Sequence, residues 1–106
     1  MLAASRVQPE RRQSERDEVF YRTRASAAGL GSFPAQVVNI SANGFMARTE
    51  VEVPIGQRLS IRLPVIGEVK AEVRWSLGGR IGCQFERMID LASYLDLLGT
   101  LLKETR

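Results

Sequence analysis

The sequence predicts a mainly β protein with six antiparallel strands, arranged as a sandwich or a small barrel, and one α-helix at the C-terminal end. From Val19 onward, short segments alternate apolar and polar residues with a period of two, which is typical of half-buried strands. Turn residues interrupt these segments about every ten residues, as in all-β domains. After residue 89 the apolar residues recur at helical spacing instead. A chain of 106 residues has the size of one domain.

The N-terminal segment differs in composition from the rest of the chain. Residues 1–18 contain four arginines and four acidic residues, with almost no large apolar side chains. Such a segment buries too little apolar surface to offset the entropy lost on ordering. We therefore expect a flexible arm over residues 1–18 and a folded domain over residues 19–106.

Six strands are predicted from the alternation. They cover residues 19–27, 35–40, 45–51, 58–63, 69–75 and 81–85. Between the last two, Gly78-Gly79 has the form of a two-residue hairpin turn. In the fifth strand, the alternation predicts that Val73 and Trp75 share the apolar face. Most aromatic side chains are expected at core positions: Phe20, Tyr21, Phe33, Phe45, Trp75, Phe85 and Tyr94.

A helix is predicted from Asp90 to about Lys103. Asp90 is a favourable N-cap residue, and the apolar residues after it recur at helical spacing. We expect these side chains to pack on protein, with the helix covering an open end or face of the sheet. Contact with a second copy is the alternative. The apolar set comprises Leu91, Tyr94, Leu95, Leu98, Leu101 and Leu102.

Composition excludes several classes of protein. No segment approaches the roughly 20 apolar residues of a membrane span, and the N-terminus has no apolar signal-peptide core. Cys83 is the only cysteine and histidine is absent, so neither a disulfide, a metal site nor a base-activated nucleophile is expected. We therefore expect a cytoplasmic protein that is not an enzyme, is not inserted in a membrane and holds no metal or cofactor.

Arginine supplies 13 of the 15 basic residues, and the formal net charge is +3. Its planar guanidinium binds phosphates bidentately, pairs with guanine edges and stacks on bases. Arg12 and Arg16 form a pair four residues apart in the arm. About 1.5 pairs with this spacing are expected by chance. Arg58 and Arg62 have the same spacing, so the spacing alone is weak evidence.

A second motif lies where the second predicted strand turns into the third. Asn39, Ser41 and Gly44 form the pattern N-x-S-x-x-G, which this composition would produce by chance only about 0.03 times. The pattern also has a structural interpretation, because Asn and Ser side chains cap tight turns and glycine tolerates positive φ. Its rarity makes it the more informative of the two motifs.

Together the two motifs resemble those of the PilZ domain family, in which R-x-x-x-R in an N-terminal arm precedes D/N-x-S-x-x-G. The likeness continues through the Pro-Ile-Gly-Gln turn at 54–57, the Val-Arg-Trp segment at 73–75 and Gly-Cys-Gln-Phe at 82–85. The resemblance implies a bacterial six-stranded antiparallel β-barrel and, in many members, a receptor for the second messenger cyclic di-GMP.

The resemblance also implies roles for individual residues. Arg12 and Arg16 would hold guanine edges and phosphates, and Asn39 and Ser41 would hydrogen-bond the nucleotide. Gly44 would leave room at the turn. Asn39 stands where the family more often has aspartate, so a neutral acceptor replaces a charge-assisted one. Arg11 has two interpretations, an additional ligand contact or a solvated charge.

Three functions compete. A cyclic di-GMP receptor, whose arm orders around the ligand and changes the surface shown to a protein partner, is favoured by both motifs. A PilZ-like adaptor that binds protein but no nucleotide is the alternative. A single-stranded nucleic-acid binder needs exposed aromatics in a basic groove, and none is predicted, so no DNA or RNA partner is expected. The protein partner, the ligand stoichiometry and the oligomeric state stay open.

Overall fold

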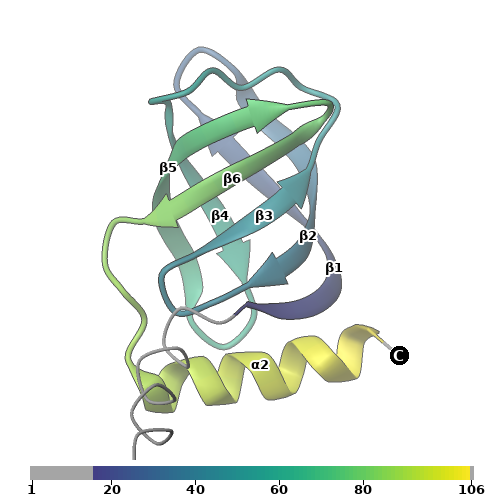
Figure 1. Ribbon diagram of the computed structural model, residues 1–106, viewed down its shortest axis with the longest axis vertical. Coiled ribbons are helices and arrows are strands. Elements are labelled where there is room, and N and C mark those ends of the chain that lie inside the picture. Colours follow the sequence, from purple (N-terminus) through teal and green to yellow (C-terminus); the bar gives the residue numbers. More distant parts are fainter. Residues whose placement is uncertain (1–15, 106) are drawn as a thin grey trace, which may run out of the picture.

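Six antiparallel strands wind into a closed barrel, and one helix lies across an end of it (Figure 1). The structure is a computed structural model and describes residues 16–105. Neighbouring strands follow the order β1-β2-β3-β6-β5-β4, and β4 closes the ring against β1. The predicted six-stranded antiparallel barrel with a C-terminal helix is confirmed. Its elements are β1 (Asp17–Ala27), β2 (Gly31–Ile40), β3 (Gly44–Arg48), β4 (Arg58–Leu63), β5 (Gly67–Leu77), β6 (Arg80–Phe85) and α2 (Leu91–Thr105).

The hydrophobic core fills the inside of the barrel. In β4 the side chains of Leu59, Ile61 and Leu63 are buried, whereas the residues between them are partly or fully exposed, as strand alternation predicts. Phe45 and Phe85 meet inside, with ring centroids 5.5 Å apart. Closure leaves the sheet without a free edge, because every strand has a neighbour on both sides.

Two strand limits differ from the prediction by three residues or more. β2 begins at Gly31 rather than at residue 35, because the hairpin with β1 already pairs Ala27 with Gly31. β3 ends at Arg48 rather than at residue 51. After it the chain turns, and the Thr49 hydroxyl accepts a hydrogen bond from the Val51 N–H at 3.2 Å. A side-chain bond of this kind replaces a bond of the strand ladder, so pairing stops there.

The first strand also starts earlier than predicted. β1 begins at Asp17, so two residues that the sequence assigns to the arm belong to the barrel. The flexibility predicted for the rest of the arm stays a prediction, because residues 1–15 lie outside the described part of the chain.

The hairpin predicted between the last two strands is confirmed. Leu77 pairs with Arg80 across the turn. Gly78 and Gly79 have φ values of 60° and 79°, the left-handed conformation that a two-residue turn of this type requires. Glycine adopts it without the steric cost that a Cβ would bring.

The apolar face predicted for the fifth strand is wrong at its end. Val73 is buried, but Trp75 lies on the outside of the barrel and is 38% exposed. The cause is a bulge in β5: Val73 pairs with Cys83 and Trp75 with Gly82, so β5 has one extra residue between them. A bulge breaks the alternation of a strand and redirects the side chains after it. Phe20, also predicted in the core, is exposed as well.

The helix α2 begins where predicted, directly after Asp90. The Asp90 carboxylate accepts a hydrogen bond from the Ser93 N–H at 3.0 Å, which is the geometry of an N-cap. Hydrogen bonds from the Ser93 side chain and backbone lower the pKa of Asp90. In the described part of the chain, no helix has the length and apolar character that a membrane crossing requires.

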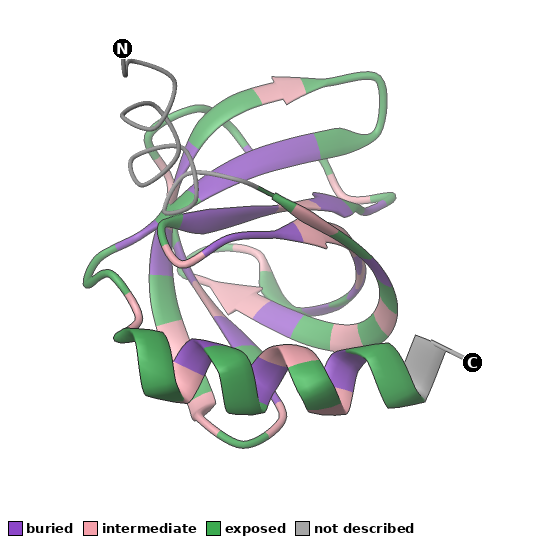
Figure 2. Cartoon of the chain, turned by 60° about the horizontal axis from the view of Figure 1, so that its bottom comes forward, coloured by how far each residue is buried: buried purple, intermediate pink, exposed green. Residues whose placement is uncertain are grey.

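Only part of the predicted apolar set of α2 packs on the barrel. Tyr94 and Leu101 are buried as expected, and so is Leu97, which the predicted set did not contain. Figure 2 shows these buried positions recurring along the helix between exposed ones. The prediction that all these leucines pack on protein is wrong within this chain for three exposed residues: Leu91, Leu95 and Leu102.

Candidate functional site

A hydrogen bond joins the two motifs that the sequence singled out. Arg16, the residue before β1, donates from Nη1 to Oδ1 of Asn39 near the end of β2, at 2.9 Å. The pairing of β1 with β2 explains this hydrogen bond, because Glu18, two residues after Arg16, lies opposite Asn39. The structure therefore brings one member of the arginine pair to the second motif. Arg11 and Arg12 lie outside the described residues.

Ser41 shapes the turn between β2 and β3. Its side chain is buried, at 2% exposure, and its Oγ accepts a hydrogen bond from the Asn43 N–H at 3.2 Å. Its own N–H donates to the carbonyl oxygen of Gly44 at 2.8 Å. Both bonds hold the backbone of a tight turn. The contact expected between Ser41 and a nucleotide stays a prediction.

Gly44 is required for a different reason from the one that the sequence suggests. It is not one of the positive-φ glycines of the described chain. A Cβ at Gly44 would overlap the backbone carbonyl oxygen of Cys83, on the neighbouring strand β6. Glycine therefore allows β3 and β6 to approach closely. The room expected for a ligand at this turn stays a prediction.

Asn39 belongs to a row of residues that crosses five strands on the outside of the barrel. Its Nδ2 lies 3.8 Å from the Met46 sulfur, so the two side chains share a face. Measured around the curved wall of the barrel, four strand spacings of about 4.8 Å give the row a length of roughly 19 Å. We call it the Asn39 row, and it consists of Glu18, Asn39, Met46, Gly82 and Trp75, each paired with the next.

The far end of the Asn39 row is an aromatic side chain. A Cβ at Gly82 would overlap the Trp75 indole, so the ring covers the backbone of this glycine. The indole is packed there, and 38% of the residue is still exposed. An aromatic ring that is packed on one side and open on another can stack on a planar ligand without losing much conformational freedom.

All three irregularities of the sheet adjoin the Asn39 row. The register shifts fall between Glu18 and Tyr21 in β1, next to Asn39 in β2, and next to Trp75 in β5. Bulges redirect side chains and are frequent beside functional sites. Here they place a polar amide and an indole on the outer face. The sequence carries no clear signal for them, which is why Trp75 was missed as a site residue.

Exposed positive charge lies beside the Asn39 row. Arg48 and Arg80 pair across β3 and β6, two residues beyond Met46 and Gly82 respectively. Both are exposed, and so is Arg22 of β1. None of these three side chains forms a hydrogen bond or ion pair with another described residue. Sequence reasoning did not select them, although their outward positions in strands follow from the alternation.

A cleft continues from this basic group. Its volume is about 790 Å³, and Phe20, Arg22, Gln36, Arg48 and Gly79 are among its lining residues. Neither Asn39 nor the turn after it lines the cleft. Of the motif residues, Arg16 is exposed and Asn39 is partly exposed, whereas Ser41 and Gly44 are buried. A ligand bound over Arg16 and Asn39 would need a further segment to cover it.

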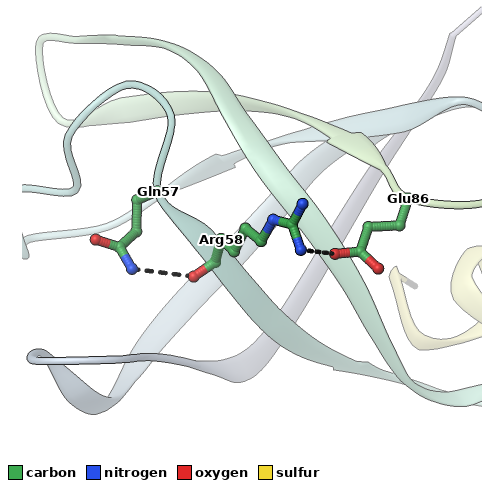
Figure 3. A network of polar contacts seen from close by, with 3 residues as sticks. All are labelled: Gln57, Arg58 and Glu86. Atoms are coloured by element: carbon green, nitrogen blue, oxygen red, sulfur yellow. Dashed lines mark hydrogen bonds and ion pairs between the residues drawn. The ribbon is translucent and has the colours of Figure 1, made fainter.

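The second arginine pair of the sequence lies elsewhere. Arg58 and Arg62 are on β4, which is opposite β3 in the ring of strands. Arg58 forms an ion pair with Glu86, with Nη1 and Oε2 3.5 Å apart, and its carbonyl oxygen accepts a hydrogen bond from Gln57 (Figure 3). An exposed pair of this kind contributes little to stability. The two arginine pairs thus share a spacing but not an environment.

Tyr94 of α2 supports the start of β1. Its hydroxyl lies 2.6 Å from Oδ2 of Asp17 and 3.1 Å from the carbonyl oxygen of Ile40. Its pKa is raised, first by burial and then by the hydrogen bond to the Asp17 carboxylate and its charge. Asp17 follows Arg16 directly, so the helix anchors the segment from which the site arginine projects.

The fold and these contacts define a small β-barrel domain whose outer surface carries exposed arginines, an amide and a partly exposed indole. In the described residues no three His, Cys, Asp or Glu side chains cluster closely enough to hold a metal ion. A comparison with protein families matches residues 10–104 to the PilZ domain. The chain belongs to the PilZ domain family. A comparison with curated proteins found no match.

Proposed function

We propose that this PilZ domain binds cyclic di-GMP on the outside of the barrel, over the Asn39 row. The observation that carries the proposal is the 2.9 Å hydrogen bond from Arg16 to Asn39, across a sequence separation of 23 residues. It brings together one residue from each motif. PilZ domains are generally modules for this ligand, and the family match spans nearly the whole chain.

The chemistry of the surface suits the ligand, which has two guanine bases and two phosphate charges. The Trp75 indole offers a stacking face for one base. The Asn39 amide has both a donor and an acceptor for a base edge. The Arg16 guanidinium can bind a phosphate bidentately or pair with guanine O6 and N7. Ligand binding would then exchange the Arg16 bond to Asn39 for bonds to the nucleotide.

The exposed arginines beside the row supply further positive charge. Arg48 and Arg80 lie two residues from the row and have no acidic partner among the described residues. Anionic phosphates near them would be stabilised by charge-assisted hydrogen bonds. We propose that these two residues support binding and that Arg12, Arg16 and Asn39 recognise the nucleotide specifically.

The signal would pass to a protein partner through the arm. The composition of residues 1–15 does not support a core of their own, and two more arginines of the arm, Arg11 and Arg12, precede Arg16. Their ordering around the nucleotide would cover the open surface of the Asn39 row. The new surface is what a partner would recognise.

Calorimetric titration of the full chain tests the function directly. We expect saturable binding of cyclic di-GMP, and weaker or no binding of cyclic di-AMP and GTP. Cyclic di-AMP keeps the phosphates but changes the base edges, so it separates guanine recognition from charge. Equal affinity for all three nucleotides would contradict a specific site. No binding of any of them would leave the nucleotide-free adaptor as the function.

A further inference from the structure

Exposed arginines form a stripe across four neighbouring strands of the barrel. Arg22 of β1 pairs with Gln36 of β2, which pairs with Arg48 of β3, and Arg48 pairs with Arg80 of β6. We call these four residues the basic stripe. Its three arginines are exposed. Two like charges directly opposite each other in a sheet oppose folding, so the Arg48–Arg80 pair indicates a role outside the fold itself.

The arginines of β4 have the opposite arrangement. Arg58 pairs with Glu72 of β5, and Arg62 pairs with Glu68. Arg58 also forms the ion pair with Glu86 that Figure 3 shows. Each arginine of β4 therefore lies opposite a carboxylate, whereas those of the basic stripe lie opposite each other or opposite a glutamine. Both sets are exposed, so exposure alone does not explain the difference.

Two exposed aromatic side chains lie beside the ends of the basic stripe. Phe20 comes two residues before Arg22 on β1 and is 51% exposed. Trp75, which is 38% exposed, pairs with Gly82, two residues after Arg80 on β6. The sequence alone predicts both rings in the core, where no ligand could reach them. On the outside they supply the aromatic faces that binders of single-stranded nucleic acid need beside positive charge.

The cleft beside the stripe joins one of these aromatics to the arginines. Phe20, Arg22 and Arg48 line its volume of about 790 Å³, and so does Gly79, the neighbour of Arg80. The β1 and β6 ends of the stripe therefore border one concave surface. Around the wall, three strand spacings of about 4.8 Å separate these ends by roughly 14 Å. Stacked nucleotides advance by about 3.4 Å each, so the stripe matches roughly four nucleotides, a site size found in small barrels that bind single strands.

We propose that the basic stripe, together with Phe20 and Trp75, is a binding site for single-stranded nucleic acid. The guanidinium groups donate hydrogen bonds to successive phosphates, and bases stack on the two rings without regard to sequence. A duplex keeps its base faces covered, so it offers this site only its charge. This activity goes beyond cyclic di-GMP binding and does not depend on it.

An acidic peptide is the other partner that positive charge would attract. Extended peptides commonly bind by adding a strand to the edge of a sheet. In the part of the chain that the structure describes, the barrel is closed and every strand has two neighbours, so a peptide would find charges but no backbone partners. A nucleic-acid strand needs no such edge, because its backbone carries the charge and its bases supply the stacking faces. The observations therefore favour nucleic acid.

Fluorescence anisotropy with the full chain tests the proposal. The probe is a labelled oligothymidine of about 12 nucleotides, and cyclic di-GMP is left out because Trp75 also belongs to the Asn39 row. We expect saturable binding that weakens as salt increases. A duplex of the same length and an oligoglutamate of the same charge should each bind at least about tenfold more weakly. Absence of binding at low salt would overturn the proposal, and so would a duplex or an oligoglutamate that binds as tightly as the single strand.

Matched arginine variants test the position of the site. Arg48→Ala and Arg80→Ala should each weaken binding by about threefold to tenfold and lower its salt dependence, because each removes one phosphate contact. Arg58→Ala and Arg62→Ala remove the same charge from β4 and should leave affinity unchanged. Glu50→Gln should strengthen binding, since Glu50 is the acidic residue among those that line the cleft. Equal losses in all four arginine variants would indicate diffuse electrostatics and contradict a site on the stripe.

Phe20 variants separate stacking from charge. Phe20→Leu keeps an apolar side chain but removes the ring, so it should weaken binding by about fivefold or more. Phe20→Tyr keeps a ring and should bind like the wild type. Thermal melting shows whether each variant retains the fold, and we expect small changes because Phe20 is exposed. A folded Phe20→Leu variant with wild-type affinity would exclude stacking at this residue and with it the proposed site.

Discussion

The hydroxyl of Tyr94 lies 2.6 Å from the carboxylate of Asp17, although 77 residues separate them in the sequence. This contact attaches the C-terminal helix to the first residue of β1. The same hydroxyl lies 3.1 Å from the carbonyl oxygen of Ile40, at the end of β2. Tyr94 therefore fixes the two strand ends from which Arg16 and Ser41 extend. The position of the candidate site depends on the helix as well as on the barrel.

Tyr94→Phe removes this hydroxyl and keeps the ring. We expect the free energy of unfolding to fall by about 1–2 kcal/mol, because a hydrogen bond to a charged group is lost while Asp17 keeps partial access to water. Urea denaturation measures the change. Tyr21→Phe is the control, since no hydrogen bond of the Tyr21 hydroxyl to a described residue is present. Equal effects of the two substitutions would show that the contact contributes nothing specific.

The two arginine pairs should differ in their effect on binding. Arg12→Ala and Arg16→Ala should each weaken cyclic di-GMP binding by roughly tenfold to more than a hundredfold, the loss of a hydrogen bond to a charged group. Arg58→Ala and Arg62→Ala should leave affinity unchanged, because they lie on β4. Calorimetry gives the four dissociation constants. If all four variants lose affinity alike, diffuse electrostatics and not the motif drives binding.

Trp75 should contribute a stacking contact. Trp75→Ala should reduce cyclic di-GMP affinity by roughly fivefold to a hundredfold, because base–aromatic stacking is worth about 1–3 kcal/mol. Trp75→Phe should retain most of the affinity, since it keeps an aromatic face. The quenching of Trp75 fluorescence by ligand is a second measurement, because this is the only tryptophan in the chain. Full affinity in Trp75→Ala would remove this residue from the site.

Gly44→Ala should destabilise the fold. The new Cβ would overlap the Cys83 carbonyl oxygen, and β3 and β6 would have to move apart, at a cost of about 1–3 kcal/mol. Asn43→Ala is the control in the same turn, because Asn43 is exposed and its N–H bond to Ser41 is kept. Thermal melting compares them. A Gly44→Ala variant as stable as the control would mean that the strands separate without strain.

Stability should decrease as the pH rises above about 9. Burial raises the pKa of the Cys83 thiol from 9.0 to about 12, and burial with the Asp17 contact raises the pKa of Tyr94 from 10.0. Both groups ionise in the unfolded chain before they ionise in the fold, so alkali stabilises the unfolded state. Urea denaturation between pH 8 and about 11 should show the decrease. In Cys83→Ala the free energy of unfolding should fall less steeply with pH, beginning near pH 9. An unchanged slope would contradict this origin.

Local patterns in the sequence were sufficient to locate the strands and the helix, whereas the closed barrel was implied by the family resemblance. The alternation in β4, the Gly78-Gly79 turn and the Asp90 cap each depend on neighbouring residues alone, and the structure confirms all three. The family motifs were also readable, because they are strings of residue types at set spacings. Short-range rules such as these need no knowledge of what packs against what.

Only the tertiary structure decided which faces are buried and which residues meet. Trp75 is outside because a bulge in β5 breaks the alternation, and a bulge depends on the register with β6. Leu97 is buried and Leu95 exposed because α2 has leucines on two faces and only one can contact the barrel. Arg16 reaches Asn39 because β1 pairs with β2. These outcomes depend on contacts between distant segments, which local residue patterns do not encode.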